Sequence, residues 1–205
     1  MQLEVLKLEQ QKIFKKLKYF PEFYLVGGTA LALQMGHRIS IDFDLFSTKE
    51  IPPTLLDKIK IIFKEIEIKI IVNHSEQLSV KAGGTKIDFV KYKFPLILDP
   101  INFKGIKILS VPEIAAMKAY ALNYRGTLKD YIDLYFILKD KYTTLGEIRK
   151  IAEKKYKGEF NFRLFLEQTI YLKDIKEEKI HFLKKRVTKE ELLEFFQKEI
   201  KKVKI

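Results

Sequence analysis

Two acidic residues two positions apart, Asp42 and Asp44, are the first candidates for chemistry in this chain. They lie in residues 41–46, where apolar and acidic residues alternate, and this alternation predicts a strand. Side chains at positions i and i+2 of a strand point to the same face, so the two carboxylates would repel each other. A cation between them relieves the repulsion, and hard carboxylate oxygens suit Mg²⁺. The alternative interpretation is an exposed edge strand that carries two solvated aspartates.

A glycine pair, Gly27 and Gly28, precedes the acidic segment and separates a predicted strand (23–26) from a predicted helix (30–35). Thr29 can cap that helix. This order presents backbone N–H groups and the positive end of a helix to a phosphate. Neither a Walker loop nor a Rossmann fingerprint fits the glycine spacing. A lone glycine pair usually forms a turn, but a pair followed by Asp-x-Asp favours phosphate chemistry.

A third carboxylate, Asp88, lies in the apolar run 87–90. If this run forms a strand beside the first acidic strand, three carboxylates can hold two metal ions for in-line phosphoryl transfer. The alternative is an acidic residue at a strand end or on an edge strand.

These residues carry a resemblance to a known family. Gly27-Gly28-Thr29-Ala30-Leu31, followed by His37-Arg38-x-Ser40-x-Asp42-x-Asp44-Leu45-Phe46, resembles the first motif of the AbiEii/AbiGii nucleotidyltransferases. That family holds toxins of bacterial type IV toxin–antitoxin systems and belongs to the DNA polymerase β-like superfamily. Residues 112–121 with Arg125, and then residues 129–134, resemble its later motifs, so the resemblance covers residues 25–138.

The resemblance implies a metal-dependent transfer of NMP from an NTP to an acceptor hydroxyl, with an RNA (tRNA) 3′ end as the expected acceptor. It implies a toxin with a cognate antitoxin and two Mg²⁺ (or Mn²⁺) ions held by Asp42, Asp44 and Asp88. The implied catalytic residues are those three with Lys118 and Asp130. The implied nucleotide-binding residues are Gly27, Gly28, Thr29, Arg38, Ser40, Lys118 and Asp133.

The later motifs also make physical sense by themselves. Lys118 is one charge in the otherwise apolar helix predicted at 112–125, so it needs an anion, either a triphosphate or an acidic side chain. The alternative is a lysine at the helix edge that reaches solvent. Asp130 and Asp133 are i and i+3 of a predicted helix and can share a face, although Asp130 in the first turn also suits the helix dipole.

Strands come first along the chain and helices later, which predicts an α+β fold. We expect a polymerase β-like core of a mixed sheet flanked by helices (1–110) and a C-terminal helical lobe packed on it (111–205). Further strands are predicted at 66–72, 77–81, 86–92 and 106–109, with a hairpin turn at 82–85. Helices are predicted at 3–18, 53–65, 112–125, 128–139, 144–156, 160–172 and 188–202.

Charge and composition limit the function classes. The 205 residues include 39 Lys+Arg and 27 Asp+Glu, a net charge of +12, which favours a polyanionic partner. The chain has no cysteine, which excludes disulfide scaffolds, cysteine–zinc sites and thiol nucleophiles and fits a cytoplasmic protein. No signal peptide or apolar stretch of about 18 residues occurs, so no membrane partner is expected.

Much of the excess charge falls in the helical lobe, which we therefore expect to carry an RNA backbone. The basic residues concerned are Lys150, Lys154, Lys155, Lys157, Arg163, Lys184, Lys185 and Arg186. Solvated helix faces are the alternative. Two rival functions stay open: a transferase that nucleotidylates a protein, and a non-catalytic nucleic-acid-binding module on the same fold.

Overall fold

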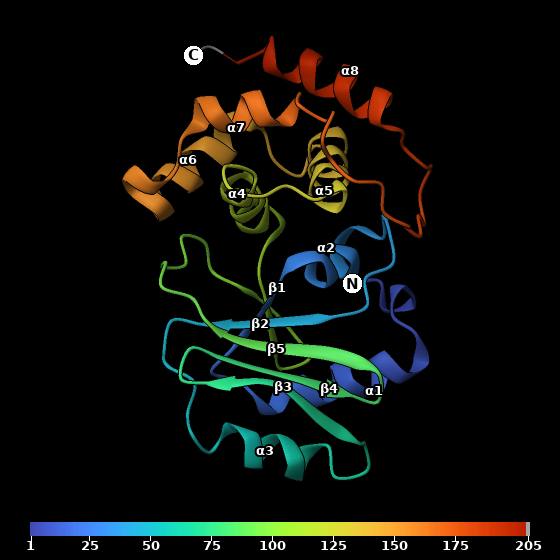
Figure 1. Ribbon diagram of the computed structural model, residues 1–205, viewed down its shortest axis with the longest axis vertical. Coiled ribbons are helices and arrows are strands. Elements are labelled where there is room, and N and C mark those ends of the chain that lie inside the picture. Colours follow the sequence, from blue (N-terminus) through green and yellow to red (C-terminus); the bar gives the residue numbers. More distant parts are fainter. Residues whose placement is uncertain (204–205) are drawn as a thin grey trace. The chain divides into compact units, whose positions relative to one another are not determined.

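The computed structural model describes residues 1–203, which pack into two compact units (Figure 1). The first unit comprises Met1–Pro95 and Asp99–Leu109, and the second comprises Leu96–Leu98 and the chain from Ser110 onward. The expected domain boundary at residue 110 stays a prediction, and limited proteolysis would test it.

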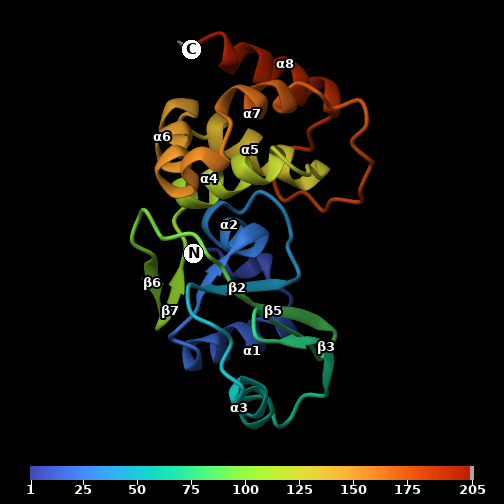
Figure 2. The same cartoon turned by 60° about the vertical axis from the view of Figure 1, so that its left-hand side comes forward.

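The first unit is built on one mixed seven-stranded sheet in the order β3-β4-β5-β2-β1-β7-β6 (Figures 1 and 2). Strand β2 pairs with β5, and β1 with β7, in parallel, and the other neighbours are antiparallel. The strands are β1 Tyr24–Val26, β2 Phe43–Ser47, β3 Ile68–His74, β4 Gln77–Ala82, β5 Thr85–Lys91, β6 Ile101–Phe103 and β7 Ile106–Ile108. The α+β class with a mixed sheet is therefore confirmed. Strand β6 was not predicted.

The helices of the first unit differ from their predicted bounds: α2 begins earlier than predicted, and α1 and α3 are shorter at both ends. They are α1 Leu8–Lys16, α2 Gly27–Met35 and α3 Leu55–Ile62, with short 3₁₀ turns at Leu3–Val5 and Leu17–Tyr19. The single helix expected at 3–18 is interrupted because Leu6 and Lys7 are extended. The Gln10 side chain accepts from the Lys7 N–H and donates to the Ile41 carbonyl, which fixes the start of α1.

An aromatic cluster forms part of the buried core of this unit and packs on one face of the sheet. Phe43 of β2 packs on Phe14 of α1, with ring centroids 6.3 Å apart. Phe89 of β5 packs on Phe20, which in turn stacks on Phe63 at the end of α3. Because successive side chains alternate along a strand, the residues next to Phe43 and Phe89 face the opposite side of the sheet.

The second unit is helical, as expected for the C-terminal part of the chain. Its helices are α4 Val111–Leu122, α5 Leu128–Lys139, α6 Leu145–Tyr156, α7 Phe162–Thr169 and α8 Lys189–Ile200 (Figure 1). Helices α5, α6 and α8 each begin at a threonine capping box, Thr127 with Asp130, Thr144 with Glu147 and Thr188 with Glu191. These local signals explain why their predicted starts agree with the structure to within one residue.

No helix within residues 1–203 has the length and apolar character needed to cross a membrane.

Candidate active site

The acidic face of the sheet brings two predicted site residues together. Asp44 of β2 is the register partner of Asp88 of β5, and Val26 of β1 is the partner of Asp44 on its other side. Paired residues of neighbouring strands lie about 4.8 Å apart and share a face. The carboxylate side chains of Asp44 and Asp88 therefore lie on the face opposite the aromatic core.

A lysine holds the third carboxylate. The Lys86 ammonium lies 2.6 Å from Asp88 Oδ2, and the Asp88 side chain is only 12% exposed. The hydrogen bond to Asp88 raises the pKa of Lys86. Partial burial opposes the rise, and the negative charges of Asp88, Asp44 and Asp42 add to it. The Lys86 ammonium therefore interacts electrostatically with all three acidic residues. The other carboxylate oxygen, Asp88 Oδ1, is buried and lacks a hydrogen-bond partner among the described residues.

The two-ion metal site expected from Asp42, Asp44 and Asp88 stays a prediction. Within residues 1–203, no three acidic or histidine side chains lie close enough together to hold one metal ion. Asp42 precedes β2, so strand alternation does not fix its side chain, and Asp88 Oδ2 is paired with Lys86. The donors that are present, the Asp44 carboxylate and the unpartnered Asp88 Oδ1, are hard oxygens that suit a divalent cation.

The glycine pair contacts this acidic face. Gly27 has φ +70°, and a Cβ added there would lie 2.5 Å from Asp44 Oδ2. A Cβ added at Gly28 would lie 2.6 Å from the Arg38 guanidinium and 3.1 Å from Ser40 Oγ. Helix α2 begins at this pair, and its N-cap residue supplies no side-chain hydrogen bond. A helix N-terminus, a guanidinium and a carboxylate thus meet around two residues without side chains.

Thr29 and Arg38 are buried in this region. The Thr29 hydroxyl is hydrogen-bonded to Ser40 Oγ at 2.9 Å and to the Asp42 carbonyl, and the residue is 1% exposed. It therefore ties the first turn of α2 to the loop that leads into β2. Arg38 donates to the Ile39 carbonyl at 3.2 Å, which places its guanidinium beside Gly28.

The second unit holds the three later candidates in one cluster. Lys118 Nζ lies 2.8 Å from Asp130 Oδ1 and 2.8 Å from Asp133 Oδ2, and Asp133 is fully buried. The anion that this lysine needs is thus supplied by α5. Burial raises the pKa of Asp130, but the charge and hydrogen bond of Lys118 outweigh burial and leave that pKa below its usual value. Asp130 also accepts from the Thr127 N–H and so caps α5.

A buried ion pair in the second unit was missed by the sequence interpretation. Lys155 Nζ lies 2.7 Å from Glu113 Oε1, both side chains are 0% exposed, and Glu113 also accepts from the backbone N–H groups of Ile97 and Leu98. Lys155 therefore cannot contact RNA, which corrects its inclusion among the RNA-binding lysines. Lys155 follows the buried Ile148 and Ala152 on α6 at helical spacing, so it lies on the buried face of that helix. This spacing is the sequence signal that could have predicted its burial.

Several other basic residues of that group are partly neutralised. Lys184 pairs with Asp140, Lys185 with Glu191 and Arg163 with Glu167, all on exposed surfaces. Exposed pairs are weak and leave positive charge accessible, so these residues stay candidates for phosphate contacts.

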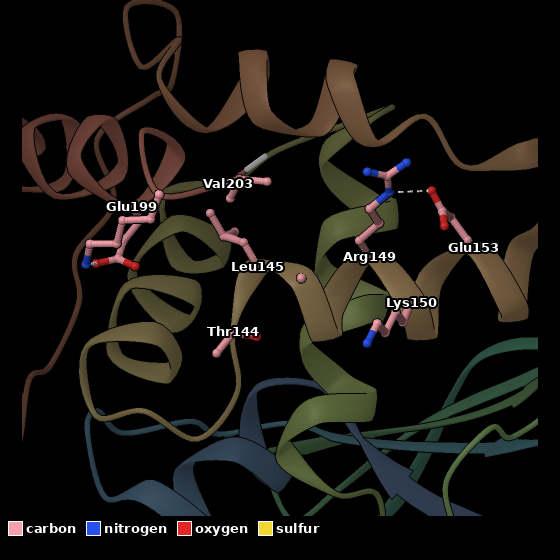
Figure 3. Close-up of a pocket in the computed structure, with 9 residues that line it drawn as sticks. Thr144, Leu145, Arg149, Lys150, Glu153, Glu199 and Val203 are labelled. Atoms are coloured by element: carbon pink, nitrogen blue, oxygen red, sulfur yellow. Dashed lines mark hydrogen bonds and ion pairs between the residues drawn. The ribbon is translucent and has the colours of Figure 1, made fainter. Parts of the chain in front are cut away.

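A cavity of about 610 Å³ on the second unit contains none of the residues expected to bind metal or nucleotide or to act in catalysis (Figure 3). Its lining includes Arg149, which is paired with Glu153 at 2.8 Å, and Glu199, which is paired with Lys202. Lys150 also lines this cavity, and the described residues hold it in no ion pair.

The mixed sheet, the aspartates paired across it and the helix that begins at a glycine pair are a fold and a site that can be compared with those of known nucleotidyltransferases. Solved structures share the fold. A protein of H. pylori described as a nucleotidyltransferase matches with a TM-score of 0.62 and 19% identity, covering 94% of this chain and 93% of that one. JHP933 from Helicobacter pylori matches with a TM-score of 0.54 and 16% identity, covering 96% of each chain. The antibiotic-resistance factor ANT(2'')-Ia matches with a TM-score of 0.51 and 14% identity, covering 70% of this chain and 89% of that one.

The chain belongs to the family described as "Nucleotidyl transferase AbiEii toxin, Type IV TA system", whose sequence profile matches residues 12–204. An uncharacterized protein of Aquifex aeolicus (strain VF5) is 34% identical over 201 residues, which is 96% of each chain. The resemblance carried by the sequence motifs is therefore confirmed, as is nucleotidyltransferase activity as the class of reaction.

Proposed function

We propose that this toxin-family enzyme transfers NMP from an NTP to the 3′-terminal hydroxyl of an RNA, with tRNA as the expected acceptor. The observation that carries the proposal is the register of Asp44 with Asp88, directly beside the glycine pair that begins α2. Carboxylates next to a helix N-terminus combine sites for cations and for phosphate groups.

The residues of the first unit suit binding of the triphosphate. The backbone N–H groups at Gly27 and Gly28 point from an N-terminus without a side-chain cap, and the Arg38 guanidinium lies beside them. In this proposal Gly27, Gly28 and Arg38 bind phosphate oxygens. Thr29 and Ser40 act by holding α2 against the acidic segment, through the hydrogen bonds that join them.

The proposed reaction is attack of the acceptor oxygen on the α-phosphorus. The bond from that oxygen to the α-phosphorus forms, the bond from the α-phosphorus to the oxygen bridging to the β-phosphorus breaks, and pyrophosphate leaves. Asp88 accepts the hydroxyl proton, a role that its unpartnered Oδ1 fits. Asp42, Asp44 and Asp88 would hold Mg²⁺ or Mn²⁺, which supplies charge neutralisation for the transferring group.

Lys118, Asp130 and Asp133 stay proposed contacts for the nucleotide or the acceptor. Because two carboxylates already bind the Lys118 ammonium, a phosphate would have to compete with both of them. We therefore expect Asp130 and Asp133 mainly to position Lys118.

An RNA acceptor is supported by charge, because a net charge of +12 exceeds what one NTP needs. Lys150, Lys154, Lys157 and Arg186 are exposed, and the described residues hold none of them in an ion pair. They are the strongest remaining candidates for contacts to an RNA backbone. The family also implies a cognate antitoxin as a partner of the system.

Incubation with each α-labelled NTP, Mg²⁺ and total RNA tests this proposal. Label in RNA of tRNA size supports it, and label on a protein supports the rival protein acceptor. Absence of label from both, with every NTP, would contradict it. The second rival, a non-catalytic module, is set aside because the family is one of nucleotidyltransferases.

A further inference from the structure

Lys86 is a charged residue inside the acidic site for which the proposed reaction has no use. It lies two residues before Asp88 on β5, so both side chains share the acidic face. Its ammonium donates a short hydrogen bond to Asp88 Oδ2, at 2.6 Å. The Lys86 side chain is 42% exposed, which lets the ammonium swing into solvent without disturbing the core.

We propose that Lys86 is a resident counter-cation of the acidic site, which holds Asp88 when no divalent ion is bound and is displaced from Asp88 Oδ2 when one binds. This inference rests on the proposed function, because it needs Asp88 to be a ligand in the active enzyme.

The charges support a competition. Asp42, Asp44 and Asp88 carry three negative charges when ionised, and Asp88 is almost buried, so a carboxylate left without a counter-charge there would be costly. Lys86 supplies one positive charge beside Asp88 when no metal is bound, and a divalent ion that replaces the ammonium there supplies two. Charge-assisted hydrogen bonds of this length are strong, so the ammonium and a divalent ion would compete for the same oxygen.

The inference also explains why three oxygen-rich side chains do not form a metal cluster in the structure. Asp88 turns Oδ2 to the ammonium and leaves Oδ1 buried without a partner. Loss of the ammonium would free both oxygens of Asp88, so a variant without it should bind divalent ions more tightly.

The test is titration of the full chain with Mn²⁺, without nucleotide, followed by calorimetry and by the electron-spin signal of unbound Mn²⁺. Lys86→Met should bind Mn²⁺ about 10-fold more tightly than wild type, a modest factor because the pair is partly exposed. Lys81→Met is the matched control. Lys81 is the register partner of Lys86 on β4, is exposed, and has no ion pair in the described residues. Its Mn²⁺ affinity should stay within about 3-fold of wild type.

A second readout does not depend on metal affinity. In EDTA, Lys86→Met should melt at a lower temperature than Lys81→Met, because it leaves Asp88 without its counter-charge, and Mn²⁺ should raise its melting temperature more. Lys86→Gln, which keeps a hydrogen-bond donor, provides the same comparison if Lys86→Met fails to fold.

The outcomes separate the inference from the proposed function. Unchanged or weaker Mn²⁺ binding by both Lys86 variants overturns the inference, while loss of binding in Asp44→Asn keeps the proposed metal site. If wild type binds no Mn²⁺ at millimolar concentrations, or Asp44→Asn binds it normally, the proposed metal site is wrong and the inference falls with it.

Discussion

Replacing Gly27 by alanine should strongly reduce activity while leaving the protein folded. The added Cβ would lie 2.5 Å from Asp44 Oδ2, whereas ordinary contact begins near 3.4 Å, so the carboxylate must retreat by about 0.9 Å. A displacement of about 1 Å in a reacting group can cost about 100-fold in rate. We therefore expect nucleotidyl transfer to fall by about 100-fold.

The chain offers a matched control for the backbone effect. Gly84, in the turn between β4 and β5, has φ +89°, and a Cβ added there meets nothing within 4 Å. Both substitutions place alanine in the left-handed region, which costs about 1–2 kcal/mol, or about 2–8 °C in melting temperature for a chain of this length. Only Gly27→Ala also disturbs a carboxylate.

The assay is release of pyrophosphate at saturating NTP, beside a thermal melt of each variant. Gly84→Ala should keep its rate within about 3-fold of wild type. If Gly27→Ala transfers as fast as Gly84→Ala at equal stability, the close contact of Gly27 with Asp44 has no part in activity and the reasoning fails.

Further predictions concern the second unit. Lys155→Met should lower the free energy of unfolding in urea by about 3–5 kcal/mol, because Glu113 would stay buried without its counter-charge. The exposed control Lys154→Met should change it by less than about 0.5 kcal/mol. A small loss for both variants would contradict the buried pair. The folded pKa of Asp130 lies below its ordinary value of 3.8, so its stabilisation is present above about pH 4 and is lost as pH falls through the folded pKa. Unfolding measured from pH 5 to pH 2 should therefore show wild type approaching Asp130→Asn, and a constant gap would refute the assignment. Replacing Lys184, Lys185 and Arg186 together by glutamate should weaken RNA binding and leave NTP binding intact. With four to six phosphate contacts, a rise from 50 to 200 mM salt should weaken wild-type RNA binding by roughly 50- to 2,000-fold, and salt-insensitive binding would favour a protein acceptor.

Local chemistry made part of the fold predictable. The threonine capping boxes mark the starts of α5 and α6, and two glycines with positive φ, Gly83 and Gly84, form the turn that joins β4 to β5. Alternation along β2 and β5 was enough to place one acidic residue on each strand opposite the apolar core. These features depend on residues that are close in sequence, where propensity and side-chain spacing are informative.

Features set by distant residues were not predictable. The parallel register of β2 with β5, which pairs Asp44 with Asp88, depends on strands far apart in the chain. One local feature was also missed: Lys86 and Asp88 are two residues apart on β5, so strand alternation places both side chains on one face, where they form an ion pair. Lys155 was assigned to the surface by its charge, and only its helical spacing indicated burial beside Glu113.

The central claim is transfer of a nucleotide from the α-phosphorus of an NTP by the acidic site of the first unit. The most direct measurement supplies the same NTP labelled at either the α- or the γ-phosphate and compares wild type with Asp44→Asn and Asp88→Asn. We predict that the α-label alone enters the acceptor, with one pyrophosphate released per label, and that both variants lose transfer while melting no more than a few degrees from wild type. Transfer of the γ-label, or transfer at the wild-type rate by either variant, would contradict the account.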